Sequence, residues 1–185
     1  MTNRAFSRDT ILKALERLAG LLAQRGVQGE ICLLGGTVMV VAFKARPSTK
    51  DVDAIFQPAQ VIRELATIVQ EEMSLPDNWI NDAAKGFVSQ AHEVVEGDLP
   101  QFENLRVTAP VPEYLLAMKC MASRIPAGST EIGDIADIRF LIRHLGLTSV
   151  GQAIVIVSKY YADERIPARA RFVLEDIFAE LGDDR

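Results

Sequence analysis

The segment LLGGTVMVVAFKARPSTKDVDAIF, residues 33–56, contains a glycine pair and an Asp-x-Asp, and its pattern predicts the order of the first strands and helices. It overlaps the end of a short apolar segment, Glu30 to Leu34, and turns at Gly35-Gly36. The apolar residues from Thr37 to Lys44 predict a buried helix, and the proline that follows shortly afterwards breaks it. From Asp51 to Phe56 polar and apolar residues alternate at first, as in a strand. We therefore expect a strand, a glycine turn, a helix and a second strand.

Asp51 and Asp53 are one residue apart in the second of these strands. Successive side chains of a strand point to opposite faces of the sheet, so the two carboxylates share one face and Val52 lies on the other. Two carboxylates this close repel each other unless a cation lies between them. Oxygen ligands of this kind suit Mg²⁺, which proteins hold with one or two carboxylates and substrate phosphates. We therefore expect Mg²⁺ or Mn²⁺ at Asp51 and Asp53.

The glycine pair has a possible role in binding phosphate. A glycine turn that ends a strand and opens a helix exposes backbone N–H groups at the positive end of that helix. Thr37 adds a hydroxyl at the same end. Taken singly, a Gly-Gly is also an ordinary turn and an Asp-x-Asp is also an exposed strand face. The order and spacing of the two together favour a metal-assisted site for a nucleoside triphosphate.

The remaining sequence predicts more helices than strands. A first helix capped by Ser7 or Asp9 closes at Gly26. The segment SLPDNWINDAAK, residues 74–85, predicts a cap at Asp77 and a short helix, and Leu105 to Ala109 predicts a third strand. The expected helices in the rest of the chain cover residues 59–73, 114–124, 131–145, 148–161 and 167–181, with Pro112 at the start of the second.

This order of elements predicts an α+β fold. Residues 1–110 are expected to form a core with a small mixed β-sheet and flanking helices. Residues 111–185 are expected to form a helical C-terminal part that packs on this core.

Composition and charge limit the kinds of protein that this chain can be. The net charge of −5 argues against a protein that mainly coats nucleic acid, which needs a basic face. The apolar runs are too short to span a bilayer, and the first ten residues lack the apolar region of a secretory signal. Cys32 and Cys120 are the two cysteines, and both lie among apolar residues. We therefore expect reduced core cysteines in a cytoplasmic protein without a membrane partner.

The segment GGTVMVVAFKARPSTKDVD, residues 35–53, resembles the signature of the polymerase-β-like nucleotidyltransferase superfamily. In that superfamily a Gly-Gly or Gly-Ser turn and a helix precede an Asp-x-Asp strand. The segment is most similar to the AbiEii-like toxin branch, in which Gly-Gly-Thr is followed by an Arg and then by Ser/Thr-x-Asp-x-Asp. Seven residues of this chain match these positions, and the resemblance implies that they bind phosphate, nucleotide or metal. They are Gly35, Gly36, Thr37, Arg46, Thr49, Asp51 and Asp53.

The resemblance also covers two later segments. The branch carries a Lys in a later helix and an Asp in the next one, and PEYLLAMKCMASR supplies Lys119 and Arg124. The segment GDIADIRFLIRHLGL supplies Asp134 and Asp137. The resemblance implies a phosphate contact for Lys119, whose alternative is an ordinary solvated lysine. Arg124 is expected to be structural or a secondary phosphate contact.

Asp134 and Asp137 are the candidates for a third acidic group. Many relatives carry a third carboxylate on a strand after the Asp-x-Asp strand, but NLRVTAP, residues 104–110, contains none. We prefer Asp134 as the catalytic residue and Asp137 as a structural or ionic partner. The resemblance covers roughly residues 30–146.

Together these features predict a metal-dependent nucleotidyltransferase. It would transfer a nucleoside monophosphate from a nucleoside triphosphate to a hydroxyl of tRNA or of a protein. The resemblance implies the toxin of a toxin–antitoxin pair, with a cognate antitoxin as partner. Two alternatives are an inactive nucleotidyltransferase-like module that binds a nucleotide or a protein, and a purely structural protein that needs no metal.

Overall fold

The computed structural model describes residues 5–123 and 133–183, which form two compact units. Within this described part, residues 5–86 and 94–109 belong to the first unit, and residues 87–93, 110–123 and 133–183 belong to the second. The described residues form seven α-helices, a five-stranded mixed sheet and a two-stranded sheet. The fold is therefore α+β, as the sequence predicted.

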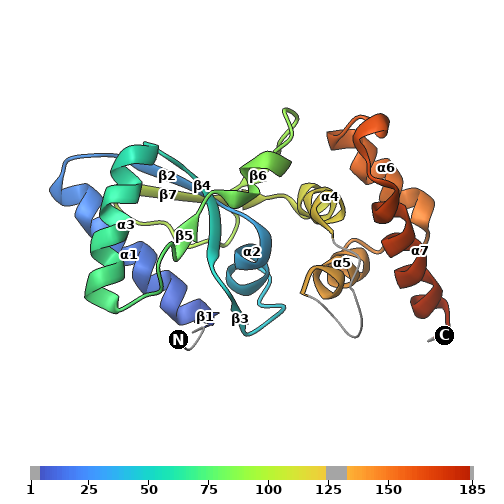
Figure 1. Cartoon of the computed structure of the whole chain (residues 1–185), viewed down its shortest axis with the longest axis horizontal. Helices are drawn as coiled ribbons and strands as arrows, with labels where there is room; N and C mark the ends of the chain where they lie inside the picture. The colour runs from blue at the N-terminus through green and yellow to red at the C-terminus, as the bar shows by residue number, and fades with distance from the viewer. Residues whose placement is uncertain (1–4, 124–132, 184–185) are drawn as a thin grey trace. The chain divides into compact units, whose positions relative to one another are not determined.

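The five-stranded sheet is the centre of the first unit (Figure 1). Its strand order is β5-β4-β2-β7-β6. The three longest strands are β2 (Gly29–Leu33), β4 (Val52–Gln57) and β7 (Leu105–Pro110), which confirms the three strands expected from the sequence within about one residue at each end. Strand β2 is antiparallel to β4 and parallel to β7. The two-residue strands β5 (Ile80–Asn81) and β6 (Val94–Val95) form the edges.

One face of this sheet is apolar and the other is more open. In β2 the side chains of Ile31 and Leu33 are buried, whereas that of Cys32 between them is only half-buried. Leu33 lies opposite the buried Ala54 of β4, and Cys32 lies opposite the half-buried Ile55. By the same alternation, half-buried Asp53 lies on the more open face.

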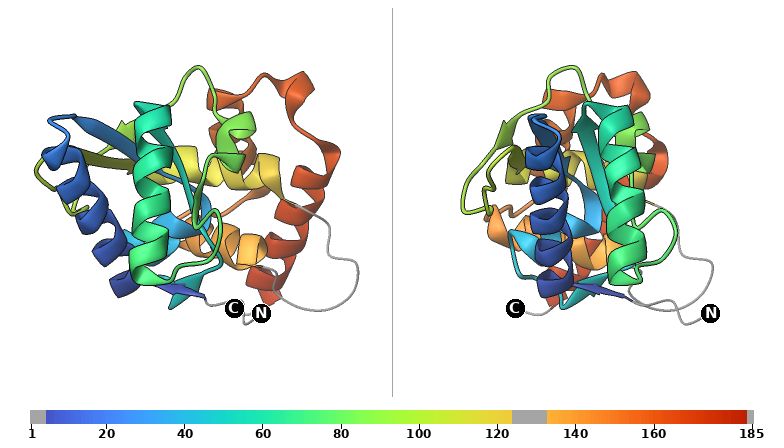
Figure 2. Two further views of the ribbon diagram at one scale, coloured as in Figure 1. Left: turned by 60° about the vertical axis from the view of Figure 1, so that its left-hand side comes forward. Right: turned by 90° about the vertical axis from the view of Figure 1, so that its left-hand side faces the viewer.

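Helices α1 (Arg8–Gln24) and α3 (Ala59–Met73) pack against each other, and α3 also contacts β4 of the sheet. Figure 2 shows the two helices side by side from two directions. The hydroxyl of Ser7 caps α1 by accepting a hydrogen bond from the backbone N–H of Thr10 at 3.3 Å. The helix ends just before Gly26, whose φ of +64° favours glycine. Both ends were predicted from the sequence.

Helix α2 (Gly35–Val41) begins at the glycine pair and is buried along almost its whole length. It is shorter than the helix expected to reach Lys44, because Lys44 has a φ of +52°. The strands β1 (Phe6–Ser7) and β3 (Ser48–Thr49) then form an antiparallel pair. This pair ties the segment that leads into Asp51 to the start of α1.

The segment from Ser74 to Lys85 differs from the prediction. A helix after Asp77 was expected, but the chain forms strand β5 and then a short 3₁₀ helix, Ala83–Phe87. The backbone N–H of Val52 donates to the carbonyl oxygen of Trp79 at 2.7 Å, and β5 continues this pairing with β4. Pairing with a strand distant in sequence therefore outweighs the local preference of this segment.

The second unit is a group of helices around α4 (Pro112–Ala122). Residues Tyr114 to Met121 of α4 are all buried, and the helix contacts α5 (Gly133–His144), α6 (Val150–Tyr160) and α7 (Ala168–Asp183). Because α4 is apolar on almost every side, it can be stable only inside such a group. Pro112 occupies its first turn, as predicted.

A short segment of the unit, residues 87–93, comes from earlier in the chain. The backbone N–H of Ser89 donates to the Tyr114 hydroxyl at 2.7 Å, and the backbone N–H of Val111 donates to the carbonyl oxygen of Glu93 at 3.0 Å. Lys159 forms an ion pair with Glu93 at 2.8 Å and, with a hydrogen bond from Tyr160, lowers the pKa of that carboxyl.

No helix in the described ranges of either unit is long and apolar enough to cross a membrane.

Candidate functional site

Two carboxylates lie at the start of β4, on the more open face of the first unit's sheet. Asp51 immediately precedes the strand, and Asp53 is its second residue. Both side chains are half-buried, whereas Val52 between them is fully buried. The sequence predicted two acidic residues on one face of a strand, and the burial pattern agrees with that arrangement.

Gly35 allows Asp53 to approach the turn closely. A Cβ atom at Gly35 would lie 2.7 Å from the Asp53 Oδ2 atom, and the φ of Gly35 is +54°. The backbone N–H of Leu34 also donates to the Asp53 carbonyl oxygen at 2.8 Å. A residue with a side chain at position 35 would therefore be strained and would displace the Asp53 carboxylate.

Gly36 accommodates a guanidinium group. A Cβ atom at Gly36 would lie 1.8 Å from Arg46 Nη2 and 2.7 Å from Thr49 Oγ1. The Arg46 Nη2 group donates to Thr49 Oγ1 at 3.3 Å. One anionic group, Asp53, and one cationic group, Arg46, thus lie against the two glycines of this turn.

Thr37 supports the backbone of the acidic pair. Its side chain is fully buried, and its hydroxyl donates to the carbonyl oxygen of Asp51 at 3.4 Å. The Thr37 hydroxyl is therefore hydrogen-bonded to the backbone of Asp51. A contact between Thr37 and a phosphate stays a prediction. Thr49 is also buried, with its oxygen accepting from Arg46.

Asn81 belongs to this group of residues, and the sequence did not reveal it. It lies in β5, opposite Asp53 in the parallel pairing of β4 and β5. Its Nδ2 group donates to Asp51 Oδ2 at 3.1 Å, and its Oδ1 atom accepts from the backbone N–H of Ala83 at 2.9 Å. A strand of two residues has no periodic pattern, so the sequence carried no signal for this position.

The oxygen atoms of Asp51 and Asp53 are the candidate ligands of a divalent cation. Carboxylate oxygens are hard donors, and Mg²⁺ commonly takes one or two of them while water and substrate phosphates complete its coordination. This donor set fits Mg²⁺ or Mn²⁺. In the part of the chain that the structure describes, no group of three or more His, Cys, Asp or Glu side chains is arranged to hold a metal ion.

The other predicted site residues lie in the second unit, where Lys119 is buried between two carboxylates. Its Nζ atom is 2.8 Å from Asp134 Oδ1 and 2.7 Å from Asp137 Oδ2. The exposed fractions of the three side chains are 7% for Lys119, 34% for Asp134 and 3% for Asp137. The three residues selected from the sequence therefore form one ion-paired group that joins α4 to α5.

The sequence predicted that this group and the acidic pair of β4 share one cleft, and that remains a prediction. Arg124, the other cation selected in this region, lies outside the described residues. The ammonium group of Lys119 has its charge balanced within its own unit.

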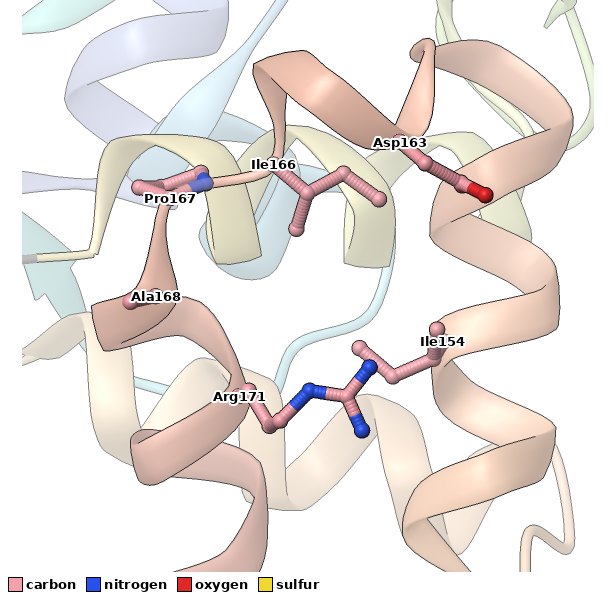
Figure 3. A pocket seen from close by; sticks show the side chains of 6 residues that line it. All are labelled: Ile154, Asp163, Ile166, Pro167, Ala168 and Arg171. Carbon is pink, nitrogen blue, oxygen red and sulfur yellow. The ribbon is translucent and has the colours of Figure 1, made fainter.

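A small cavity of about 180 Å³ lies between α6 and the start of α7 in the second unit. Figure 3 shows the Arg171 guanidinium and Ile154 extending toward each other across it, and Asp163 near its rim. The Asp163 carboxylate accepts a hydrogen bond from Ser158 at 2.6 Å. None of the residues that the sequence selected for a site lines this cavity.

The fold and this site define an α+β protein with two carboxylates at a glycine turn. No known protein family, curated protein or solved structure matches the chain.

Proposed function

We propose that the chain is a metal-dependent nucleotidyltransferase, whose metal site lies at Asp51 and Asp53. The observation that supports this most strongly is the packing of Asp53 against Gly35. It brings the two sequence features, the glycine turn and the Asp-x-Asp strand, into direct contact. The same order of turn, helix and acidic strand is the basis of the resemblance to the polymerase-β-like superfamily.

In the proposed reaction a nucleoside monophosphate moves from a nucleoside triphosphate to an acceptor hydroxyl. Asp51 and Asp53 hold the divalent cation, which when bound lowers the pKa of the acceptor hydroxyl and neutralises charge on the leaving pyrophosphate. Arg46, which lies against Gly36, supplies positive charge beside the turn for the triphosphate. Because Gly35 and Gly36 carry no side chains, the Asp53 carboxylate and the Arg46 guanidinium can lie against the turn.

The resemblance implies further roles for Lys119 and Asp134, which lie in the second unit. A lysine would act as a point charge on the triphosphate, and a third carboxylate would help to hold a metal ion. The acceptor would be a hydroxyl at the end of a tRNA or on a protein. By its resemblance to the AbiEii-like branch, the protein would act in the cytoplasm as the toxin of a pair, with an antitoxin as its partner.

Two observations favour a second candidate function, a module that binds a nucleotide or a protein without turnover. Lys119 is ion-paired to both Asp134 and Asp137, so its charge is already balanced. Strand β7, Leu105–Pro110, also contains no Asp or Glu that could serve as a third carboxylate. Such a module would retain the turn and the acidic pair but lack the groups that complete catalysis.

A label-transfer experiment tests the proposal. The protein is incubated with each nucleoside triphosphate labelled at the α-phosphate, with Mg²⁺ or Mn²⁺, and with total tRNA or a protein extract. We expect label to appear on an acceptor with the wild type and to be lost with Asp53→Asn. The matched control is Asp98→Asn, which removes an exposed carboxylate from the same unit.

The two candidate functions give different results in this experiment. A nucleotidyltransferase transfers label. A binding module shows a rise in melting temperature with metal and triphosphate, since a ligand that binds only the folded state stabilises it, but transfers no label. If neither effect occurs, or if Asp53→Asn retains the wild-type effect, both candidates are wrong.

A further inference from the structure

Asn81 contacts the acidic pair from the neighbouring strand. In the parallel pairing of β4 and β5 it lies opposite Asp53, and Ile80 lies opposite Val52. Ile80 and Val52 are buried, whereas Asn81 and Asp53 are half-buried, so the two polar side chains project to the same side of the sheet. From there the Asn81 amide reaches Asp51 Oδ2 at 3.1 Å.

The orientation of this amide is fixed by its second hydrogen bond. The backbone N–H of Ala83 can only donate, and it lies 2.9 Å from one end of the Asn81 amide. That end must therefore be the oxygen, so the NH₂ group must face Asp51. The 3₁₀ helix that begins at Ala83 thus holds a hydrogen-bond donor directed at the carboxylate.

We propose that Asn81 is a positioning residue that holds the Asp51 carboxylate in the orientation that binds the divalent cation. This inference rests on the proposed function. An ionised carboxylate has about four acceptor positions on two oxygens, so one hydrogen bond from Asn81 leaves the remaining positions for a cation. Partners that orient a metal ligand in this way typically change metal affinity by about 10–100-fold when they are removed.

Two substitutions separate positioning of Asp51 from support of the backbone. In Asn81→Ser the hydroxyl can still accept from the Ala83 N–H, as serine does in turns, but it is too short to replace the amide donor at Asp51. In Asn81→Asp the acceptor for Ala83 is kept, and the NH₂ group is replaced by an oxygen that faces Asp51. Asn78→Asp is the matched control, because it adds the same charge at an exposed position of the same segment.

The measurements are the affinity for Mn²⁺ by calorimetry and the melting temperature in EDTA and in excess Mn²⁺. We expect Asn81→Ser to bind Mn²⁺ about 10-fold more weakly than the wild type, or weaker still. We expect Asn81→Asp to melt at a lower temperature than the wild type in EDTA, because its new carboxylate repels Asp51. Mn²⁺ should raise its melting temperature by more than it raises that of the wild type, whereas Asn78→Asp should respond as the wild type does.

The outcomes distinguish this inference from the proposed function. If the wild type binds Mn²⁺, Asp53→Asn does not, and both Asn81 variants respond to Mn²⁺ as the wild type does, the role of Asn81 is overturned and the metal site stands. If Asp53→Asn binds Mn²⁺ like the wild type, the proposed function fails and the role of Asn81 with it. Fluorescence of Trp79, which is buried in the same unit, shows whether each variant is folded.

Discussion

Replacing Lys119 by methionine should strongly destabilise the second unit, because it leaves a buried carboxylate without its cation. Lys119 and Asp137 are both almost fully buried and are 2.7 Å apart. Removing one partner of such a pair typically costs about 3–5 kcal/mol. The pair with the more exposed Asp134 adds at most about 1 kcal/mol, since exposed pairs contribute little. We therefore expect the free energy of unfolding to fall by about 3–5 kcal/mol.

Urea denaturation can assign this loss to the second unit. All three tyrosines lie in that unit and the one tryptophan lies in the first, so near-ultraviolet signals of the two residue types report the units separately. Lys159→Met is the control, because it breaks a lysine–carboxylate pair whose side chains are about half exposed. The double variant Lys119→Met/Asp137→Leu removes both buried charges and should recover most of the loss.

A Lys119→Met variant that is destabilised no more than Lys159→Met would show this prediction to be wrong. In that case the Lys119 ammonium would contribute little to folding. Its main role would then lie in binding a ligand, which is the role that the sequence resemblance implies.

Two further predictions follow from the glycine turn and from the cysteines. Gly35→Ala should abolish Mn²⁺ binding and should lower the melting temperature more than Gly26→Ala does. Both glycines have a positive φ, but only at Gly35 would a Cβ atom meet a side chain, that of Asp53. Equal melting temperatures of the two variants would contradict this prediction. Burial raises the pKa of the Cys120 thiol to about 12 and also raises that of Cys32. Ellman's reagent at about pH 8 should therefore label Cys120 only after unfolding. Stability should be full below about pH 8.5 and should fall as pH rises toward the folded pKa, because the unfolded thiol ionises first, and the fall should be less steep in Cys120→Ala. Rapid labelling of native Cys120 would show this prediction to be wrong.

The sequence predicted those strands and helices whose own residues show a polarity pattern or a recognisable helix start. The strands β2, β4 and β7 were visible because apolar residues alternate or run between glycine, proline and polar residues. The helices α1 and α4 were visible from a capping serine and from a proline in the first turn. These local signals were sufficient for the α+β class and for the positions of Asp51 and Asp53.

The sequence did not predict features that depend on residues distant from each other in the chain. Strand β5 exists because its backbone pairs with β4, so Asn81 could not be recognised as a partner of Asp51. The burial of Lys119 between two carboxylates likewise requires α5 to pack on α4, and the lysine alone resembled either a solvated residue or a phosphate contact. The roles of Thr37 and of the glycines in packing against Asp51, Asp53 and Arg46 also became evident only in three dimensions.

The electron paramagnetic resonance signal of free Mn²⁺ shows whether Asp51 and Asp53 hold a divalent cation. The protein is added in excess to Mn²⁺, with the wild type, Asp51→Asn and Asp53→Asn compared with the exposed control Asp98→Asn. We predict that the wild type and the control remove the free Mn²⁺ signal and that both acidic-pair variants leave most of it. Equal loss of signal with the wild type and with both acidic-pair variants, or no loss with the wild type, would show that Asp51 and Asp53 are not the metal ligands.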